Sequence, residues 1–121
     1  MFRLEEGQHR FTEILVMDEP GAGGAFHEYE ILPVAASEDL KRPPFATISF
    51  QKGPVQEFGK NGIFMEDLLQ ICRHRLKCFQ DGEFACQENG MALQNIEDAL
   101  AWLNKRTRDR QARGVEGTSD K

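Results

Sequence analysis

The sequence lacks the features of a secreted or membrane-spanning protein. Only three of its 121 residues are cysteine, and an odd number of thiols does not suit a closed disulfide framework. No stretch approaches the roughly 18 consecutive apolar residues of a membrane-spanning helix, and residues 1–6 contain no apolar signal-peptide core. We therefore expect a cytoplasmic protein with reduced thiols that does not contact a membrane.

Metal-binding and catalytic motifs are also missing. Cys72, Cys78 and Cys86 have the spacing Cys-x5-Cys-x7-Cys, which is not a familiar zinc pattern even with His74 among them. The alternative is that the thiols are buried or half-buried small hydrophobes, with Cys72 on the core side of a helix. The three histidines are scattered, and no nucleophile elbow or carboxylate pair accompanies them. The sequence predicts no metal, no cofactor and no enzyme, and it leaves the roles of the thiols open.

The length and the order of the patterns predict one α+β domain that spans residues 1–121. Three runs rich in β-forming residues, at 11–17, 27–35 and 45–51, predict a small antiparallel sheet within a β region at 1–51. A connecting loop follows at 52–62, where glycine, proline and asparagine are too frequent for regular structure.

Two amphipathic helices are predicted after this loop. The first covers about residues 64–79, and the second runs from residue 84 or 85 to 112 and ends at Gly114. The short connection at Asp81 and Gly82 makes them antiparallel neighbours, so residues 63–114 form a helical hairpin and residues 115–121 a C-terminal tail. Phe64 stands where a serine or threonine cap is usual, and Asn61 is the candidate cap for the first helix.

The second helix carries an unusual arrangement of charge. Its apolar row continues towards the C-terminus as arginines, because the same helical spacing links Ala92, Leu93, Ile96, Ala99, Leu100 and Leu103 to Arg106, Arg110 and Arg113. Guanidinium groups therefore lie where packing partners are expected, and burying an unpaired charge is costly. Either the carboxylates of another chain or a phosphate-bearing ligand is expected to meet them. Because they lie beyond the last core leucine, we expect Arg106→Ala and Arg110→Ala to abolish ligand binding and to leave the fold intact.

The overall charge restricts that partner. The net charge is −5, whereas residues 105–113 carry five basic groups and one aspartate, so this segment is +4 and the remainder is −9. An acidic protein repels the long phosphate backbone of DNA or RNA. A small anion at one concentrated basic site is still allowed. Phe84, Met91 and Trp102 lie off the main apolar row, which predicts self-association through the hairpin, and Trp102 more often serves packing than base stacking.

Motifs in residues 61–118 resemble a known family. They are Asn61-Gly62, Glu66-Asp67-Leu68-Leu69, Arg75-Leu76-x-x-Phe79-Gln80, Phe84-Ala85-Cys86-x-Glu88-Asn89 and Arg106-Thr107-x-x-Arg110-x-x-Arg113-Gly114-Val115-Glu116-Gly117-Thr118. In this order they resemble the Thoeris anti-defence protein 1 family of phages, which is related through its hairpin to the anti-CBASS protein 2 sponges. The N-terminal half resembles the family only in layout.

The resemblance implies a function as a sponge. Such proteins bind and sequester cyclic nucleotide immune signals of the infected bacterial host without cleaving them. The signal implied is the glycocyclic ADP-ribose of Thoeris, and some relatives also hold the cyclic di- or trinucleotides of CBASS in separate pockets. The resemblance further implies a homo-oligomer, either a dimer or a hexamer. The alternatives are a cyclic-nucleotide-cleaving enzyme, which the scattered histidines do not favour, and a small nucleic-acid-binding regulator, which the acidic charge does not favour.

The resemblance also implies ligand-binding residues. Arg106 and Arg110 are one helical turn apart and can both address one diphosphate. With them the resemblance assigns Phe79 as a stacking surface, Asn89 as a hydrogen-bonding amide, and Arg113. The alternatives are that Phe79 is plain core and that the arginines form salt bridges with a second subunit.

A second pocket is a further hypothesis. The glycine-rich turn before the first helix offers backbone N–H groups to phosphate. Its candidate residues are Lys60, Asn61 and Arg75. The unusual Phe64 cap weakens this hypothesis if the pocket uses the end of that helix.

Overall fold

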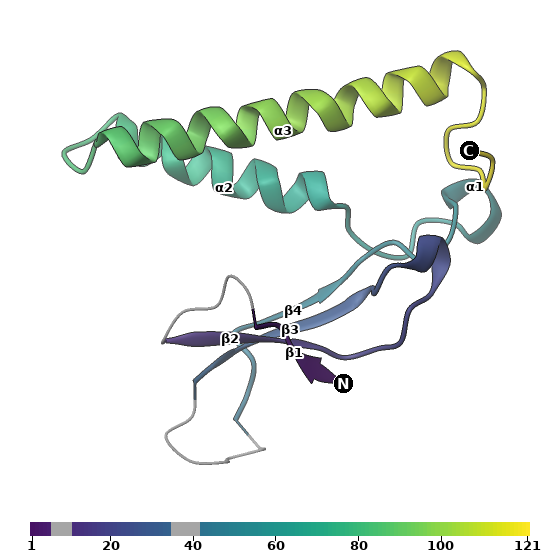
Figure 1. Ribbon diagram of the computed structural model, residues 1–121, viewed down its shortest axis with the longest axis horizontal. Helices are drawn as coiled ribbons and strands as arrows, with labels where there is room; N and C mark the ends of the chain where they lie inside the picture. The colour runs from purple at the N-terminus through teal and green to yellow at the C-terminus, as the bar shows by residue number, and fades with distance from the viewer. Residues whose placement is uncertain (6–10, 35–41) are drawn as a thin grey trace. The chain divides into compact units, whose positions relative to one another are not determined.

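The structure, a computed structural model, describes residues 1–5, 11–34 and 42–121 (Figure 1). The chain divides into two compact units, Met1–Ile63 and Phe64–Lys121. The first unit is a β-sheet with a long closing loop, and the second is a helical hairpin with its C-terminal tail. This order confirms the α+β class, and the prediction of a single domain stays a prediction.

The first unit contains a four-stranded antiparallel sheet in the order β1 (Phe2–Arg3), β2 (Thr12–Val16), β3 (Glu28–Pro33) and β4 (Ala46–Ser49). The three predicted strands are confirmed where the structure describes them; residue 35 lies outside the described part, as does His9. The expectation of three strands was wrong by one. The additional strand, β1, has only two residues, which is too short for an alternating pattern to indicate it.

The two faces of this sheet differ in polarity. Ile14 is paired with Ile31, and Val16 with Tyr29, so these residues share one face, where Tyr29 packs edge-to-face against Phe50 at 5.6 Å. Val16 is only 1% exposed. On the other face Glu13 forms ion pairs with Arg3, at 3.6 Å, and with Arg42.

The segment predicted as an irregular loop contains a short helix, α1 (Val55–Phe58). Side chains join the two ends of the whole segment, at residues 51–52 and at residue 61. Asn61 accepts a hydrogen bond from the Lys52 N–H at 2.7 Å and donates one to the Lys52 carbonyl at 2.9 Å, while Gln51 accepts one from the Asn61 N–H at 2.9 Å. Asn61 therefore closes this loop, and the expectation that it caps the next helix was wrong.

The second unit is the predicted hairpin of α2 (Met65–Gln80) and α3 (Gln87–Ala112). At the start of α2 the Asp67 carboxylate accepts a hydrogen bond from the Phe64 N–H at 2.9 Å, which provides the cap that the sequence did not identify. α3 begins two or three residues later than expected because Cys86 is its N-cap, and its Sγ accepts from the Asn89 N–H at 3.4 Å.

The hairpin buries one side of each helix only partly. Leu69 and Leu76 of α2 are half-buried, as are Leu93, Ile96, Leu100 and Leu103 of α3. Met65, Ile71, Met91 and Trp102 are exposed. All three cysteines are exposed as well, so the placement of Cys72 on the core side was wrong. Within this unit α2 packs against α3. Contact with one helix does not cover all the apolar side chains of α2, so Met65 and Ile71 remain exposed.

In the part of the chain that the structure describes, no helix combines the length and the apolar character that crossing a membrane requires.

Candidate functional site

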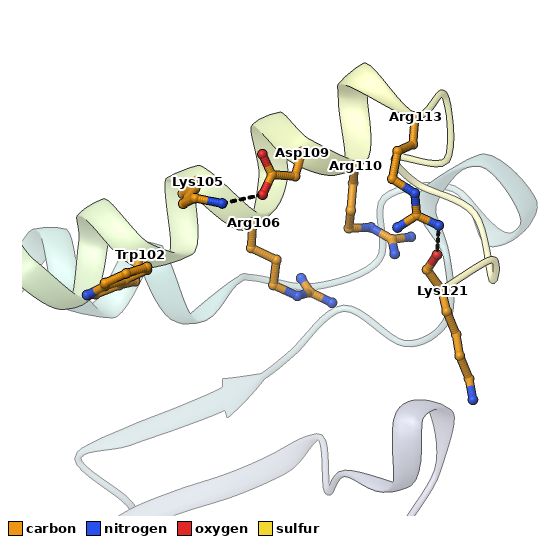
Figure 2. Close-up of a pocket in the computed structure, with 7 residues that line it drawn as sticks. All are labelled: Trp102, Lys105, Arg106, Asp109, Arg110, Arg113 and Lys121. Atoms are coloured by element: carbon orange, nitrogen blue, oxygen red, sulfur yellow. Dashed lines mark hydrogen bonds and ion pairs between the residues drawn. The ribbon is translucent and has the colours of Figure 1, made fainter.

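The three arginines of the predicted row line one pocket on the second unit (Figure 2). The pocket has a volume of about 470 Å³ and lies beside the C-terminal half of α3. It is lined by Trp102, Lys105, Arg106, Asp109, Arg110, Arg113 and Lys121. Five of these side chains are basic and one is acidic, so the pocket has a strongly positive potential.

Arg110 has a structural contact that the sequence did not reveal. Its guanidinium donates hydrogen bonds to the backbone carbonyls of Val115 at 2.9 Å, Thr118 at 3.1 Å and Asp120 at 2.8 Å. The Thr118 hydroxyl donates to the same Val115 carbonyl at 2.6 Å. The tail is therefore folded against the end of α3, and the expectation that replacing Arg110 leaves the fold intact does not take this contact into account.

The chain turns back at the end of α3 because Gly114 adopts a positive φ of 73°. Arg113, the C-cap residue of α3, donates a hydrogen bond to the carbonyl of Lys121. Arg110 and Arg113 thus both point towards the folded tail (Figure 2).

Within the described part of the chain, Arg106 has a free guanidinium group in this pocket. Among the residues that the structure describes, its guanidinium has no hydrogen bond or ion pair, whereas Lys105 is paired with Asp109 at 2.6 Å. One turn before Arg106 lies Trp102, whose side chain is 70% exposed although the sequence favoured packing for it. Lys105 and Lys121 are lining residues that the sequence did not single out, whereas Trp102 was considered as a packing residue and lies four residues before Arg106.

Phe79 and Asn89 lie at the opposite end of the hairpin. Phe79 is half-buried, and the Arg75 guanidinium carbon is 5.2 Å from the centre of its ring, a cation–π contact. Asn89 is in the first turn of α3, where its Nδ2 donates a long bond of 3.5 Å to the Phe84 carbonyl. Asn89 and Arg106 are 17 residues apart on α3, which corresponds to about 25 Å. A single chain therefore does not bring these two groups of predicted site residues together.

The predicted second pocket is divided between the units. Lys60 and Asn61 belong to the first unit, and Arg75 belongs to the second. Both polar atoms of the Asn61 amide are bonded to the Lys52 backbone, and Arg75 contacts Phe79. Lys60 is exposed.

A second hollow, of about 640 Å³, lies between α2 and α3, and the sequence did not indicate it. Arg73 and Glu97 form an ion pair across it at 3.5 Å, and Glu66 adds a further carboxylate. Its remaining lining residues are Gln70, Leu100, Ala101, Asn104 and Thr107. With two carboxylates and one guanidinium, this hollow is less suited to a phosphate-bearing ligand than the pocket beside the arginines.

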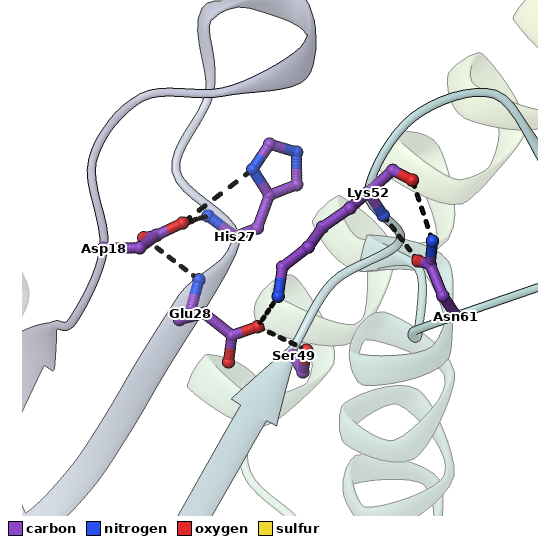
Figure 3. Close-up of polar contacts among 6 residues, drawn as sticks. All are labelled: Asp18, His27, Glu28, Ser49, Lys52 and Asn61. Atoms are coloured by element: carbon purple, nitrogen blue, oxygen red, sulfur yellow. Dashed lines mark hydrogen bonds and ion pairs between the residues drawn. The ribbon is translucent and has the colours of Figure 1, made fainter. Parts of the chain in front are cut away.

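A polar cluster at the end of the sheet has structural contacts (Figure 3). The Asp18 carboxylate accepts from the N–H groups of His27 at 3.0 Å and Glu28 at 3.2 Å. Desolvation raises the pKa of Asp18, but these hydrogen bonds outweigh it, so the net pKa is below its usual value. The pKa of Glu28 is lowered by Lys52 first and then by Ser49, whose hydroxyl is 2.6 Å away.

The described residues contain no group of three side chains that could hold a metal ion. Cys78 and His74 are in contact on α2, with Sγ and Nε2 3.9 Å apart. Among the described residues no third metal-binding side chain joins this pair. His27 is buried in the first unit beside Asp18, so the two described histidines belong to different units.

The chain is similar to a known domain family and to a phage protein. Residues 43–108, more than half of the chain, match the family model described as the Acb2/Tad1 hairpin domain. The chain is also 55% identical, over 76 residues, to a protein of Bacillus phage SBSphiJ7 named Thoeris anti-defense 1. The aligned part is 63% of this chain and 54% of the phage protein, so the chain spans about half the length of the curated relative that it matches.

Proposed function

Because this chain belongs to the Acb2/Tad1 hairpin-domain family, we propose that it is a phage anti-defence protein that sequesters a cyclic nucleotide signal. The proposed signal is the glycocyclic ADP-ribose of Thoeris, and the proposed location is the cytoplasm of the infected bacterium. The protein holds this ligand without cleaving it. An effector that needs the signal then stays inactive.

The observation that carries this proposal is the basic pocket beside α3. Its volume of about 470 Å³ is in the range of small-ligand sites. Arg106 offers an unpaired guanidinium, whose planar set of donors suits a diphosphate. Arg110 and Arg113 add positive charge from the C-terminal end of the same helix.

Phe79 and Asn89 fit this proposal if two copies of the chain contribute to one site. They lie about 25 Å from Arg106 along α3, so the ligand in one chain cannot reach both ends. A second hairpin in the antiparallel direction brings the Phe79 end of one copy to the arginine end of the other. Exposed apolar side chains of the hairpin, among them Met65 and Ile71, are available for such pairing. We therefore propose a homodimer as the binding unit, with a hexamer as the larger form.

Cyclic di- and trinucleotides of CBASS are a second proposed class of ligand, at a separate place. Lys60 is the candidate contact there on the first unit. Asn61 contributes by closing the loop at residues 52–61, because its amide is already bonded to the Lys52 backbone.

The experiment that tests the proposal is a titration followed by recovery of the ligand. Purified protein is titrated with glycocyclic ADP-ribose, cyclic dinucleotides and cyclic trinucleotides in a calorimeter. The complex is then denatured by heat, and the released compound is identified by mass spectrometry. We expect tight binding of glycocyclic ADP-ribose and recovery of the intact compound.

Other results would favour the alternatives. Recovery of a cleaved product would indicate an enzyme. Tight binding of random duplex DNA at moderate salt, with no heat from the cyclic nucleotides, would indicate a nucleic-acid-binding regulator. A protein that binds none of the cyclic nucleotides does not have the proposed function.

A further inference from the structure

One side chain, Gln80, closes the connection between the two helices of the hairpin. Gln80 is the last residue of α2. Its Oε1 accepts a hydrogen bond from the Cys86 N–H at 3.0 Å, and its Nε2 donates one to the Cys86 carbonyl at 3.0 Å. A carboxamide has the same donor and acceptor as a peptide group. Gln80 and Cys86 therefore form a closed pair of bonds, like two paired residues of neighbouring strands.

Cys86 in turn determines how α3 begins. It is the N-cap residue, and its Sγ accepts from the Asn89 N–H at 3.4 Å. Its carbonyl also accepts from the Gly90 N–H at 3.1 Å. Gln80 follows Phe79 directly in the sequence, and its amide is bonded to Cys86. Cys86 in turn holds the N–H of Asn89.

Gly90 provides the space for this contact. A Cβ atom at position 90 would be 3.2 Å from Nε2 of Gln80, which is tighter than an ordinary van der Waals contact. Glycine is a poorer helix former than alanine. α3 therefore has a residue with low helix propensity, Gly90, at the place where the Gln80 amide lies against its first turn.

We propose that Gln80 is a positioning residue for the ligand site. It fixes Phe79 and Asn89 relative to each other by holding Cys86, and it does not itself touch the ligand. Without its two bonds the connection at residues 81–86 can adopt several conformations, and ordering them on binding weakens the affinity. The inference rests on the proposed function, because it concerns the same site.

The test is the pH dependence of glycocyclic ADP-ribose binding to Gln80→Glu. A carboxylate keeps the acceptor for the Cys86 N–H and loses the donor for the Cys86 carbonyl, whereas a protonated carboxyl group has both. At pH 7.5 we expect binding about tenfold weaker than that of the wild type. Because the usual pKa of glutamate is about 4.3, the difference should shrink to about threefold or less as the pH falls towards 4.

Controls separate this effect from other titrations. Asp81, Glu83 and Glu88 are the acidic residues near the connection and are present in both proteins, so the affinities of the variant and the wild type are compared as a ratio at each pH. Gln70→Glu places the same charge on α2 far from the connection, and it should bind like the wild type at every pH.

A second variant, Gly90→Ala, covers the case in which Gln80→Glu does not fold. Alanine favours α3 but displaces the Gln80 amide, so we expect unchanged or higher thermal stability together with weaker binding. A merely structural contact would lower stability and affinity together.

The outcomes are distinguishable. If the wild type binds and Gln80→Glu binds equally well at pH 7.5, or is weakened without recovery in acid, the positioning role is refuted and the sponge function stands. If the wild type does not bind glycocyclic ADP-ribose, the proposed function is refuted and this inference with it.

Discussion

The sharpest expectation concerns Arg106 and its neighbour Arg108. Both are exposed arginines of α3, but only Arg106 lines the basic pocket. Residues two apart on a helix do not share a face. Replacing either arginine by alanine removes one positive charge from α3. Only Arg106→Ala removes a side chain that lines the pocket.

The structure allows the two effects to be estimated. Arg106 has no intramolecular polar partner among the described residues, so Arg106→Ala breaks no such contact and should leave the melting temperature unchanged. A hydrogen bond to a charged group contributes about 1.5–3 kcal/mol, which corresponds to binding about 10- to 150-fold weaker. Arg108 does not line the pocket, so its charge would act on the ligand through water. In water two unit charges about 10 Å apart interact by about 0.4 kcal/mol before screening by salt. Arg108→Ala should therefore weaken binding no more than about twofold.

The assay is calorimetric titration with glycocyclic ADP-ribose at physiological salt, with thermal unfolding as the test of the fold. Trp102 is the single tryptophan and lines the same pocket, so its fluorescence gives an independent binding signal. The reasoning is refuted if Arg106→Ala binds within twofold of the wild type. It is equally refuted if Arg108→Ala loses as much affinity as Arg106→Ala, because the effect would then come from general charge and not from the pocket.

Three further predictions concern the tail, acid stability and assembly. Arg110→Ala removes three hydrogen bonds to the tail carbonyls and should release residues 115–121, seen as faster amide exchange there; unchanged exchange would contradict the contact. The pKa values of Glu28 and Asp18 are lower in the folded protein, so their stabilisation is present above the pKa of the unfolded chain and is lost as the pH falls through the folded values. Urea unfolding from pH 6 to pH 2.5 should therefore show falling stability, with a shallower fall in Glu28→Gln, and an identical slope would argue against this role. Met65→Glu places a charge on an exposed apolar side chain of α2 and should shift a dimer towards monomer in sedimentation experiments, whereas the exposed Phe58→Glu of the other unit should not.

Much of the hairpin was predictable because helical periodicity is a local property. The spacing of leucines in α2 and α3 indicated both helices, and the turn residues at 81 and 82 indicated their connection. The sheet was predictable for the same reason, except for β1, whose two residues are recognisable only through their pairing with Val16 and Leu15. The caps were harder: Asp67 and Cys86 cap the helices, and neither was identified, because a cap depends on how the preceding chain enters the helix.

The sequence by itself determined the α+β order, the two helices and the continuation of an apolar row into arginines, because each depends on residues close together in the chain. Only the tertiary structure decided what each arginine meets. The chain reverses at Gly114, and this brings the tail carbonyls to Arg110 and Arg113 and leaves Arg106 without a partner in the described chain. The structure likewise placed Phe79 and Asn89 at the far end of the hairpin, since a straight helix of 26 residues keeps its two ends apart. Such contacts depend on where distant segments fold back, and spacing along the sequence does not contain that information.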